Sequence, residues 1–260
     1  MTESITVMHE DGISTLCFNR PEKRNAINGL MIGEFTHQLQ MFAQDQRTRI
    51  VLIRANGEHF CAGADIVWMK KIAADTHENN YADAYKLADL LYQLYYFPKP
   101  IIVLTQGATL GGGIGFISAS DIVIAADNAI FGFPEVKMGL IAATISPYVM
   151  HAIGERLARY YFLTGEQFDA NEARRIHLIH RITSEQTLLD TGLSVARLLL
   201  ENGPQALMAT KRLIHEVTQE KITQTLTKNT AKELADIRQS VEAREGFTAF
   251  LEKRKPSWNK

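Results

Sequence analysis

The sequence has few cysteines, no excess of either charge and no long apolar run, and each lack excludes a class of protein. Two of the 260 residues are cysteines, Cys17 and Cys61. We therefore expect no disulfide framework, and we expect a cytoplasmic location. Lysine and arginine number 28 against 29 acidic residues, which leaves no positive excess to attract nucleic acid or an anionic membrane surface. No run approaches the ~18 apolar residues of a membrane span. Residues 1–10 lack the basic and apolar regions of a signal peptide.

What the sequence has is enough apolar material for a large core, with 46% hydrophobic residues. β-branched and apolar runs predict short strands at 5–8, 13–18, 50–54, 101–105 and 122–125. Apolar residues at helical spacing predict helices over about 29–45 and 81–96. Strands that alternate with helices indicate an α/β fold with a parallel sheet. After residue 146 the pattern is mostly helical, with helices expected at 147–153, 170–176, 185–201, 204–219, 222–237 and 240–252.

The most distinctive stretch, Gly111-Gly-Gly-Ile-Gly115, follows the strand expected at 101–105. A strand that feeds a glycine turn and then a helix directs bare backbone N–H groups, and the positive end of the helix, at one point. That point suits an anion. The dinucleotide pattern G-x-G-x-x-G does not fit, because Phe116 stands at its third glycine. Taken alone, the stretch could equally be a tight turn that packs a helix on a strand.

A second turn of this kind runs from Ala55 to Asp65, after the strand at 50–54. Two such turns could each give one N–H group to a shared oxygen, which would form an oxyanion hole. Downstream, Phe131-Gly-Phe-Pro-Glu135 places a carboxylate directly after a rigid proline. The combination of two turns and one held carboxylate indicates a catalytic site more strongly than any one of them.

Together these segments resemble the crotonase superfamily, the enoyl-CoA hydratase/isomerase family. The resemblance lies in five segments in order, Arg20–Ala26, Phe60–Ile66, Gly107–Asp121, Phe131–Leu140 and Glu245–Lys255. It implies an α/β fold of the crotonase type, a spiral of ββα units over residues 1–195 with a C-terminal helical region over 196–260. It also implies an acyl-CoA substrate, a homotrimer or dimer of trimers, and no metal or cofactor beyond the coenzyme A that the substrate carries.

The resemblance implies a role for three residues in the chemistry. Proton removal from C2 or C4 of an acyl-CoA, or addition of water at C3 of an enoyl-CoA, places negative charge on the thioester oxygen. The backbone N–H groups of Ala64 and Gly112 would hold that charge, and Glu135 would act as acid and base, with a pKa raised by burial. Residues expected to contact coenzyme A or the acyl group are Arg24, Ala26, Ala62, Asp65, Ile66, Val67, Gly111, Gly115, Phe250 and Lys253. The last two would close over coenzyme A, within a subunit or across a subunit boundary.

One departure from the family pattern affects the reaction. Two-glutamate hydratases carry a second glutamate in G-G-G-x-E, whereas this chain has Gly115 there. Three alternatives follow: Glu135 performs both proton steps through one water, the enzyme is a Δ3,Δ2-enoyl-CoA isomerase, or a later residue such as Ser146 or Tyr148 replaces the acid. A glycine at 115 could also leave room for a branched substrate.

The segment Glu135–Val149 resembles the bacterial methylglutaconyl-CoA and carboxygeranoyl-CoA hydratase-like branch, which acts on branched enoyl-CoAs from leucine and terpenoid breakdown. We therefore expect an enoyl-CoA hydratase, a lyase, for a branched or carboxylated chain. The isomerase is the nearest alternative, and a non-catalytic acyl-CoA-binding protein is the alternative from another class.

Three further residues are expected to be structural. His177 and His180 have no carboxylate cluster nearby in sequence and are not expected to bind a metal. His177 is instead expected to take a helix C-cap conformation. Cys61 is expected to pack rather than to react.

Overall fold

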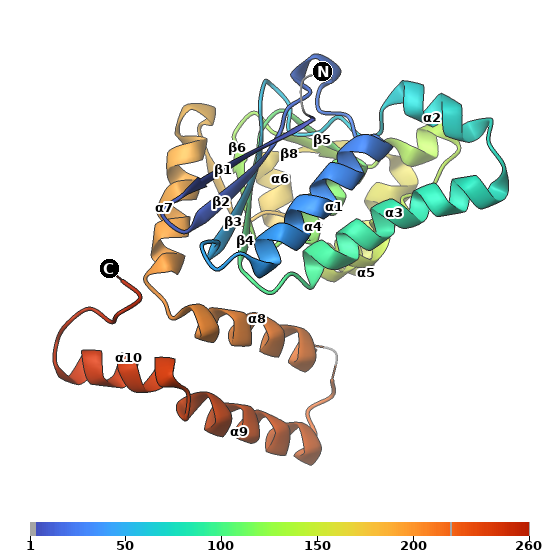
Figure 1. Ribbon diagram of the computed structural model, residues 1–260. Helices are drawn as coiled ribbons and strands as arrows, with labels where there is room; N and C mark the ends of the chain where they lie inside the picture. Colours follow the sequence, from blue (N-terminus) through green and yellow to red (C-terminus); the bar gives the residue numbers. More distant parts are fainter. Residues whose placement is uncertain (1–3, 219, 260) are drawn as a thin grey trace.

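A six-stranded sheet forms the centre of the molecule in the computed structural model, which describes residues 4–218 and 220–259 (Figure 1). Its strand order is β1-β2-β3-β4-β6-β9. The strands are β1 (Ile5–Glu10), β2 (Ile13–Phe18), β3 (Ile50–Ala55), β4 (Ile101–Thr105), β6 (Ile122–Ala126) and β9 (Arg181–Thr183). β1 and β2 form an antiparallel hairpin, and the other neighbouring strands are parallel. The predicted hairpin and parallel sheet are confirmed.

A smaller sheet contains β5 (Ala108–Leu110), β7 (Ile130–Gly132) and β8 (Gln167–Asp169). Successive strands alternate between the two sheets, since β4 and β6 join the larger one and β5 and β7 the smaller one. Single bridges of Cys61 with Thr109 and of Ala64 with Ile27 bring earlier parts of the chain to the smaller sheet. This alternation is the predicted spiral. The three-residue strands were not predicted, because they are too short to show a period.

Helices cover both faces of the larger sheet, as expected for parallel strands. The face toward the smaller sheet packs against α1 (Gly29–Gln44) and α3 (His77–Tyr95), and α7 (Leu188–Leu200) covers the opposite face. Alternation along the strands divides the buried side chains between two cores. The first core lies on the side of α1, α3 and the smaller sheet, and the second core lies on the side of α7. Val51 and Ile53 of β3 belong to the first core, and Ile50 and Leu52 to the second.

The remaining helices of the main body are α2 (Ile66–Ala73), α4 (Gly112–Ser118), α5 (Ser146–Thr164) and α6 (Ala170–Arg175). α6 begins as predicted, because the Asp169 side chain accepts a hydrogen bond from the Glu172 N–H at 2.9 Å. The first piece of α5 ends near residue 153 as predicted, because Gly154 has non-helical backbone angles, with a φ of 77°. A second helical piece, which was not predicted, follows this kink and ends at Thr164.

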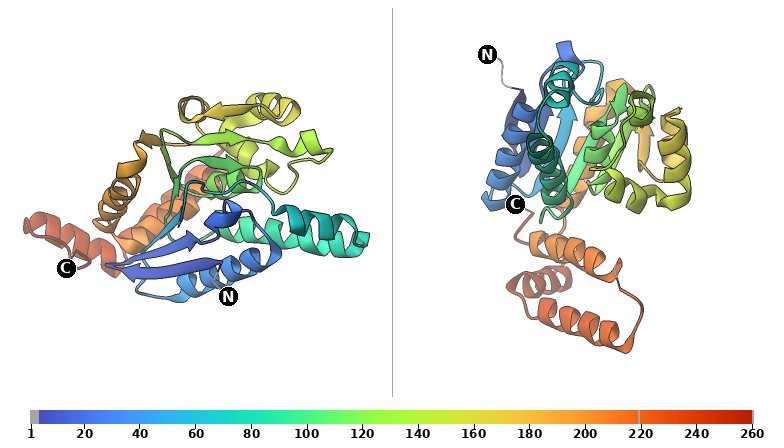
Figure 2. Two further views of the ribbon diagram at one scale, coloured as in Figure 1. Left: turned by 90° about the horizontal axis from the view of Figure 1, so that it is seen from above. Right: turned by 90° about the vertical axis from the view of Figure 1, so that its right-hand side faces the viewer.

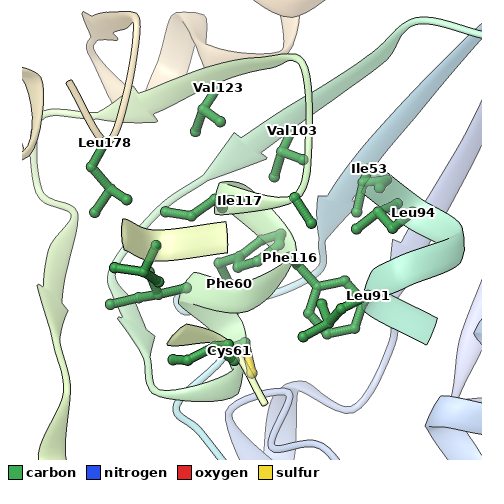
Figure 3. Close-up of a cluster of buried hydrophobic side chains, with 14 of the residues drawn as sticks. Ile53, Phe60, Cys61, Leu91, Leu94, Val103, Phe116, Ile117, Val123 and Leu178 are labelled. Atoms are coloured by element: carbon green, nitrogen blue, oxygen red, sulfur yellow. The ribbon is translucent and has the colours of Figure 1, made fainter. Parts of the chain in front are cut away.

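Aromatic packing anchors α4, the helix that begins at the glycine stretch. The Phe116 ring of α4 lies 5.2 Å from that of Phe18 and 5.0 Å from that of Phe35, in edge-on contacts. Figure 3 shows Phe116 and Phe60 in one cluster with Leu91, which comes from α3. Because these side chains are buried, the position of the α4 N-terminus is set by the core beneath it.

Three C-terminal helices extend away from the sheets (Figures 1 and 2). They are α8 (Pro204–Thr218), α9 (Gln224–Arg238) and α10 (Val241–Leu251). They match the expected helices, apart from residue 219, which lies outside the described residues. The boundary expected at residue 195 falls inside α7, and Val195 and Ala196 are buried in the second core. The C-terminal helical region therefore begins at the turn before Pro204.

Polar contacts made by Lys211 and Arg49 help to hold this region to the main body. The Lys211 ammonium group of α8 forms an ion pair of 2.7 Å with Asp121. The Arg49 guanidinium group donates to backbone carbonyls in three places, at Leu200, Asn202 and Trp258. In the described part of the chain, no helix is both long enough and apolar enough to cross a membrane.

Candidate active site

Four of the five segments that carry the sequence motifs, all except Glu245–Lys255, meet around the smaller sheet. Ile27 pairs with Ala64, Cys61 pairs with β5, and β5 pairs with β7. A cavity of about 130 Å³ opens at this place, and Ala64, Gly112 and Glu135 all line it. The structure therefore brings together the three residues predicted to perform the chemistry.

The Ala64 N–H group is left unpaired by a backbone bridge. The Ile27 N–H donates to the Gly63 carbonyl at 2.8 Å, and the Asp65 N–H donates to the Ile27 carbonyl at 2.8 Å. A parallel bridge of this pattern uses the residues on either side of Ala64. No acceptor for the Ala64 N–H occurs among the described residues.

The Gly112 N–H group is unpaired for a different reason. Gly112 is the first residue of α4, where backbone N–H groups have no partner within the helix. The preceding residue is paired, since the Gly111 N–H donates to the Gly132 carbonyl at 3.0 Å. In residues 4–218 and 220–259, the Gly112 N–H has no acceptor. Two unpaired donors lining one cavity provide the components of an oxyanion hole.

Each glycine of the triplet is required by a different neighbour. A Cβ atom at Gly111 would lie 2.9 Å from Glu135 Oε1, and Gly111 also has a positive φ of 50°. A Cβ at Gly112 would lie 2.9 Å from Ile27 Cδ1, and one at Gly113 would lie 2.9 Å from Cys61 Cβ. Cys61 is fully buried, and burial raises the pKa of its thiol to about 12. The prediction that Cys61 packs rather than reacts agrees with this position.

Glu135 is the carboxylate of the cavity. It lies in the single 3-10 turn η2 (Pro134–Met138), which Pro134 begins. Its Oε2 atom is buried and has no hydrogen-bond partner in the described structure. Burial raises the pKa of the Glu135 carboxyl above its ordinary value, and a hydrogen bond from its own N–H opposes this only in part. A carboxylate with a raised pKa and a free oxygen suits an acid–base role.

The space beside Gly115 is filled, which corrects one expectation. A Cβ atom at Gly115 would lie 2.6 Å from Ile145 Cγ2 and 3.1 Å from Leu91 Cδ1. The glycine therefore leaves no room for a branched chain at that point. Ile145, which also lines the cavity, occupies the space that a side chain at 115 would need.

The two residues considered as replacements for the missing acid are engaged elsewhere. The Ser146 hydroxyl donates to the Ala143 carbonyl at 2.9 Å. The Tyr148 ring packs against the Tyr95 ring, with centroids 5.3 Å apart. Neither residue lines the cavity of Glu135, which disfavours the hypothesis that one of them replaces the missing acid.

Several of the residues expected to contact coenzyme A lie together beside the cavity. The Ala62 N–H donates to the Arg24 carbonyl at 3.0 Å, and the Ala26 carbonyl accepts a hydrogen bond from Arg20. Arg24 also lines a neighbouring cavity of about 590 Å³. The grouping is consistent with one extended binding surface, and the role of these residues stays a prediction.

Asp65 is structural in this arrangement. Its carboxylate accepts hydrogen bonds from the N–H groups of Val67 and Trp68 at the start of α2 and forms an ion pair of 2.8 Å with Arg20. Burial opposes ionisation, but the hydrogen bonds from Arg20 and the helix start hold the pKa of Asp65 below its ordinary value. Ile66 and Val67 follow with exposed fractions of 70% and 73%, as an uncovered apolar surface.

Phe250 and Lys253 do not reach the Glu135 cavity of their own chain. Phe250, 81% exposed, lies on α10, which is well separated from α4 in the views of Figures 1 and 2. It lines a different cavity, formed within the C-terminal region. A contact with coenzyme A would therefore have to cross a subunit boundary.

The predictions for the histidines can also be compared with the structure. His177 follows Ile176, the C-cap residue of α6, and has a positive φ of 64°, so its predicted conformation at the helix C-terminus is confirmed. The His180 Nδ1 atom accepts a hydrogen bond from the Val123 N–H at 3.0 Å. It helps to attach β9 to β6.

Sequence reasoning missed several residues of the cavity wall. They are apolar or weakly polar and come from four separate segments: Ile27, Trp68, Leu87, Ile141, Ala142, Thr144 and Ile145. Hydrophobic periodicity marks Leu87 only as a helix residue. The pattern contains no signal for which core positions border a cavity.

Comparison with known proteins places this geometry in a family. A profile of the family described as Enoyl-CoA hydratase/isomerase matches residues 8–260. The structure of an enoyl-CoA hydratase from Shewanella pealeana is 42% identical, with a TM-score of 0.95, covering 98% of this chain and 96% of that one. The mevalonyl-coenzyme A hydratase sidH of Aspergillus fumigatus is 32% identical, covering 95% of this chain and 91% of the relative. The 2,3-dehydroadipyl-CoA hydratase of Escherichia coli is 29% identical, with 99% of each chain covered.

Substitution of Gly115 tests the packing against Ile145. Gly115→Glu should lower the free energy of unfolding by about 1–3 kcal/mol or more, because the new side chain overpacks the core. Adding Ile145→Ala should recover part of that loss, as expected for residues in contact. Chemical denaturation of both variants measures this. Gly33→Ala, where a Cβ meets nothing within 4 Å, is the control and should not destabilise. Wild-type stability of Gly115→Glu would contradict the contact.

Proposed function

Because the chain belongs to the enoyl-CoA hydratase/isomerase family, we propose that it hydrates a 2-enoyl-CoA thioester with Glu135 as the one catalytic carboxylate. The observation that supports this is a single small cavity that contains two unpaired N–H groups and a buried carboxylate oxygen without a partner. Relatives named as enoyl-CoA, mevalonyl-CoA and dehydroadipyl-CoA hydratases point in the same direction.

The mechanism follows from the geometry. The thioester oxygen accepts hydrogen bonds from the N–H groups of Ala64 and Gly112, which draws electron density away from C3. Glu135 takes a proton from water as the water oxygen bonds to C3, and the negative charge moves to the thioester oxygen. Glu135 then gives the proton to C2. Loss of one such N–H donor typically costs about 100- to 1000-fold in rate, so most of the catalytic effect would come from the backbone.

The proposed substrate is a short enoyl chain with a branch or a carboxyl group, such as a methylglutaconyl group. The cavity of about 130 Å³ corresponds to roughly four waters at ~30 Å³ each, which favours a short chain. The mevalonyl group in the name of one relative is a methyl-branched acyl group, whereas the dehydroadipyl group in the name of another is unbranched and carries a carboxyl group. A role in leucine degradation would follow from the branched choice.

Coenzyme A would lie along the surface of Arg24, Ala26, Ala62, Ile66 and Val67 and would be the one cofactor-like group, carried by the substrate. The exposed apolar side chains at the start of α2 suit the pantetheine arm. Cytoplasmic location is proposed from the low cysteine content alone.

A Δ3,Δ2-enoyl-CoA isomerase is the second candidate. The observation that favours it is that Ile145 fills the space beside Gly115, so the cavity has one carboxylate. One carboxylate is sufficient to move a proton between C2 and C4. The same oxyanion hole would serve that reaction.

Glu135→Gln separates catalysis from binding. Turnover should fall by at least about 1000-fold, because the amide can neither take nor give the proton, while the affinity for a saturated acyl-CoA should stay close to that of the wild type. NMR in D2O with crotonyl-CoA, 3-methylglutaconyl-CoA and a 3-enoyl-CoA measures the product. A 3-hydroxyacyl product supports hydration, and migration of the double bond without a hydroxyl supports the isomerase. Full activity of the variant would exclude both mechanisms, and tight binding with no wild-type turnover would favour a binding protein.

The pH dependence should report the environment of Glu135. The base form is the carboxylate, and burial raises its pKa, so kcat/KM should fall on the acid side at a pH above the ~4.3 of an ordinary glutamate. A raised pKa also means that ionisation of Glu135 opposes folding as pH rises through that pKa. Glu135→Gln should therefore melt at or above the wild-type temperature at pH 7. An acid limb at or below the ordinary glutamate pKa would contradict this.

We propose a homotrimer or a dimer of trimers, in which α10 contacts a neighbouring subunit. Its exposed apolar side chains are Val241 at 82%, Phe247 at 61%, Phe250 at 81% and Leu251 at 79%, and such a patch usually marks an interface. Light scattering should give three or six times the mass of one chain, and Phe250→Glu should shift it toward smaller species. A wild-type monomer at micromolar concentration would contradict the proposal.

A further inference from the structure

The wall of the Glu135 cavity is mostly apolar, and few of its side chains carry a polar group. They are Trp68, Glu135 and Thr144. The Trp68 side chain forms a hydrogen bond with the Asp83 carboxyl group. Of the described wall, Glu135 and Thr144 therefore remain as the protic side chains that can meet a reactant.

The Thr144 hydroxyl differs from that of its neighbour Ser146. Ser146 uses its hydroxyl to bond the Ala143 carbonyl at 2.9 Å, where α5 begins. Thr144 is half-buried in the preceding turn, and its hydroxyl forms no hydrogen bond with any described residue. A half-buried hydroxyl without a protein partner keeps its hydrogen-bonding capacity for water or a ligand.

Thr144 also lies next to the position from which a second acid would act. Ile145 packs over Gly115, because a Cβ there would lie 2.6 Å from Ile145 Cγ2. The residue just before it, Thr144, lines the same cavity as Glu135. The segment that fills the space beside Gly115 therefore also brings a hydroxyl to the wall of the Glu135 cavity.

Hydration with one carboxylate leaves one hydrogen of the attacking water without a protein acceptor. Glu135 accepts one O–H, and the apolar side chains around it offer no second acceptor. Without such a contact the water can rotate, and its lone pair is not held toward C3.

We propose that the Thr144 hydroxyl accepts the second O–H of the water that Glu135 deprotonates and so directs the water oxygen at C3. The inference rests on the proposed hydratase function. In the step, the C3–O bond forms, one O–H bond of water breaks, and its proton passes to Glu135 and from there to C2. Thr144 keeps its own proton and gains no charge.

Thr144→Val tests this, because valine keeps the shape and removes the hydroxyl. The kcat for hydration of the preferred 2-enoyl-CoA should fall about 10- to 100-fold, the value of one lost hydrogen bond in a dry site, with little change in KM. Deuterium uptake at C2 of butyryl-CoA in D2O needs Glu135 and the two N–H groups but no positioned water, so it should stay near the wild-type rate. Thr144→Ser should keep most of the hydration activity.

Ser146→Ala is the matched control and should behave as the wild type in both assays. Hydration by Thr144→Val at the wild-type rate would overturn the proposal. An equal loss of hydration and of C2 exchange would also overturn it, because that result marks a packing role. If Thr144→Val does not fold, Thr144→Ala gives the same comparison.

Failure of the proposed function would look different. A wild-type enzyme that exchanges the C2 proton but hydrates no enoyl-CoA would not be a hydratase, and the role of Thr144 would be rejected with it. A wild-type enzyme that hydrates, with Thr144→Val unchanged, would reject the role of Thr144 alone.

Discussion

Two backbone N–H groups without partners are the feature on which the rest of the structure depends. Most backbone N–H groups in proteins are paired within the fold. Ala64 is exposed and Gly112 is half-buried, and the local backbone offers neither N–H group a partner. At Ala64 the parallel bridge to Ile27 uses the flanking groups, and at Gly112 the start of α4 has no carbonyl to offer. Both donors therefore belong to the fold and not to any side chain. Phe116, held by the aromatic core, keeps the second of them in place.

The apolar wall of the Glu135 cavity affects both the oxyanion hole and the acid–base group of the proposed reaction. An apolar wall strengthens hydrogen bonds to a developing negative charge, because the local dielectric is low. It also raises the pKa of Glu135 above its ordinary value, which makes that carboxyl better suited to give and take protons. The cost is a carboxylate oxygen with no partner, a feature that is unfavourable for folding and that a site for a bound substrate explains.

The contact between Gly115 and Ile145 accounts for the absence of a second acidic side chain at position 115. Glycine at 115 is explained neither by a turn nor by access for a substrate, because Ile145 and Leu91 occupy the space beside it. Because the large Ile145 side chain packs directly against Gly115, an acidic side chain at 115 would require a smaller residue at 145. The side chains that we propose for the reaction are consequently drawn from the segment 135–145 and not from α4.

The sequence by itself determined the five longer strands, most helices, the family and the positions of Ala64, Gly112 and Glu135, because each depends on local periodicity or on a contiguous motif. His177 was placed correctly for the same reason. Only the tertiary structure decided that Ile145 closes the space at Gly115, that Thr144 and not Ser146 lines the cavity, and that α10 lies away from its own active site. These are contacts, or missing contacts, between segments far apart in the chain. They depend on how side-chain volumes fill one space, which no local pattern encodes.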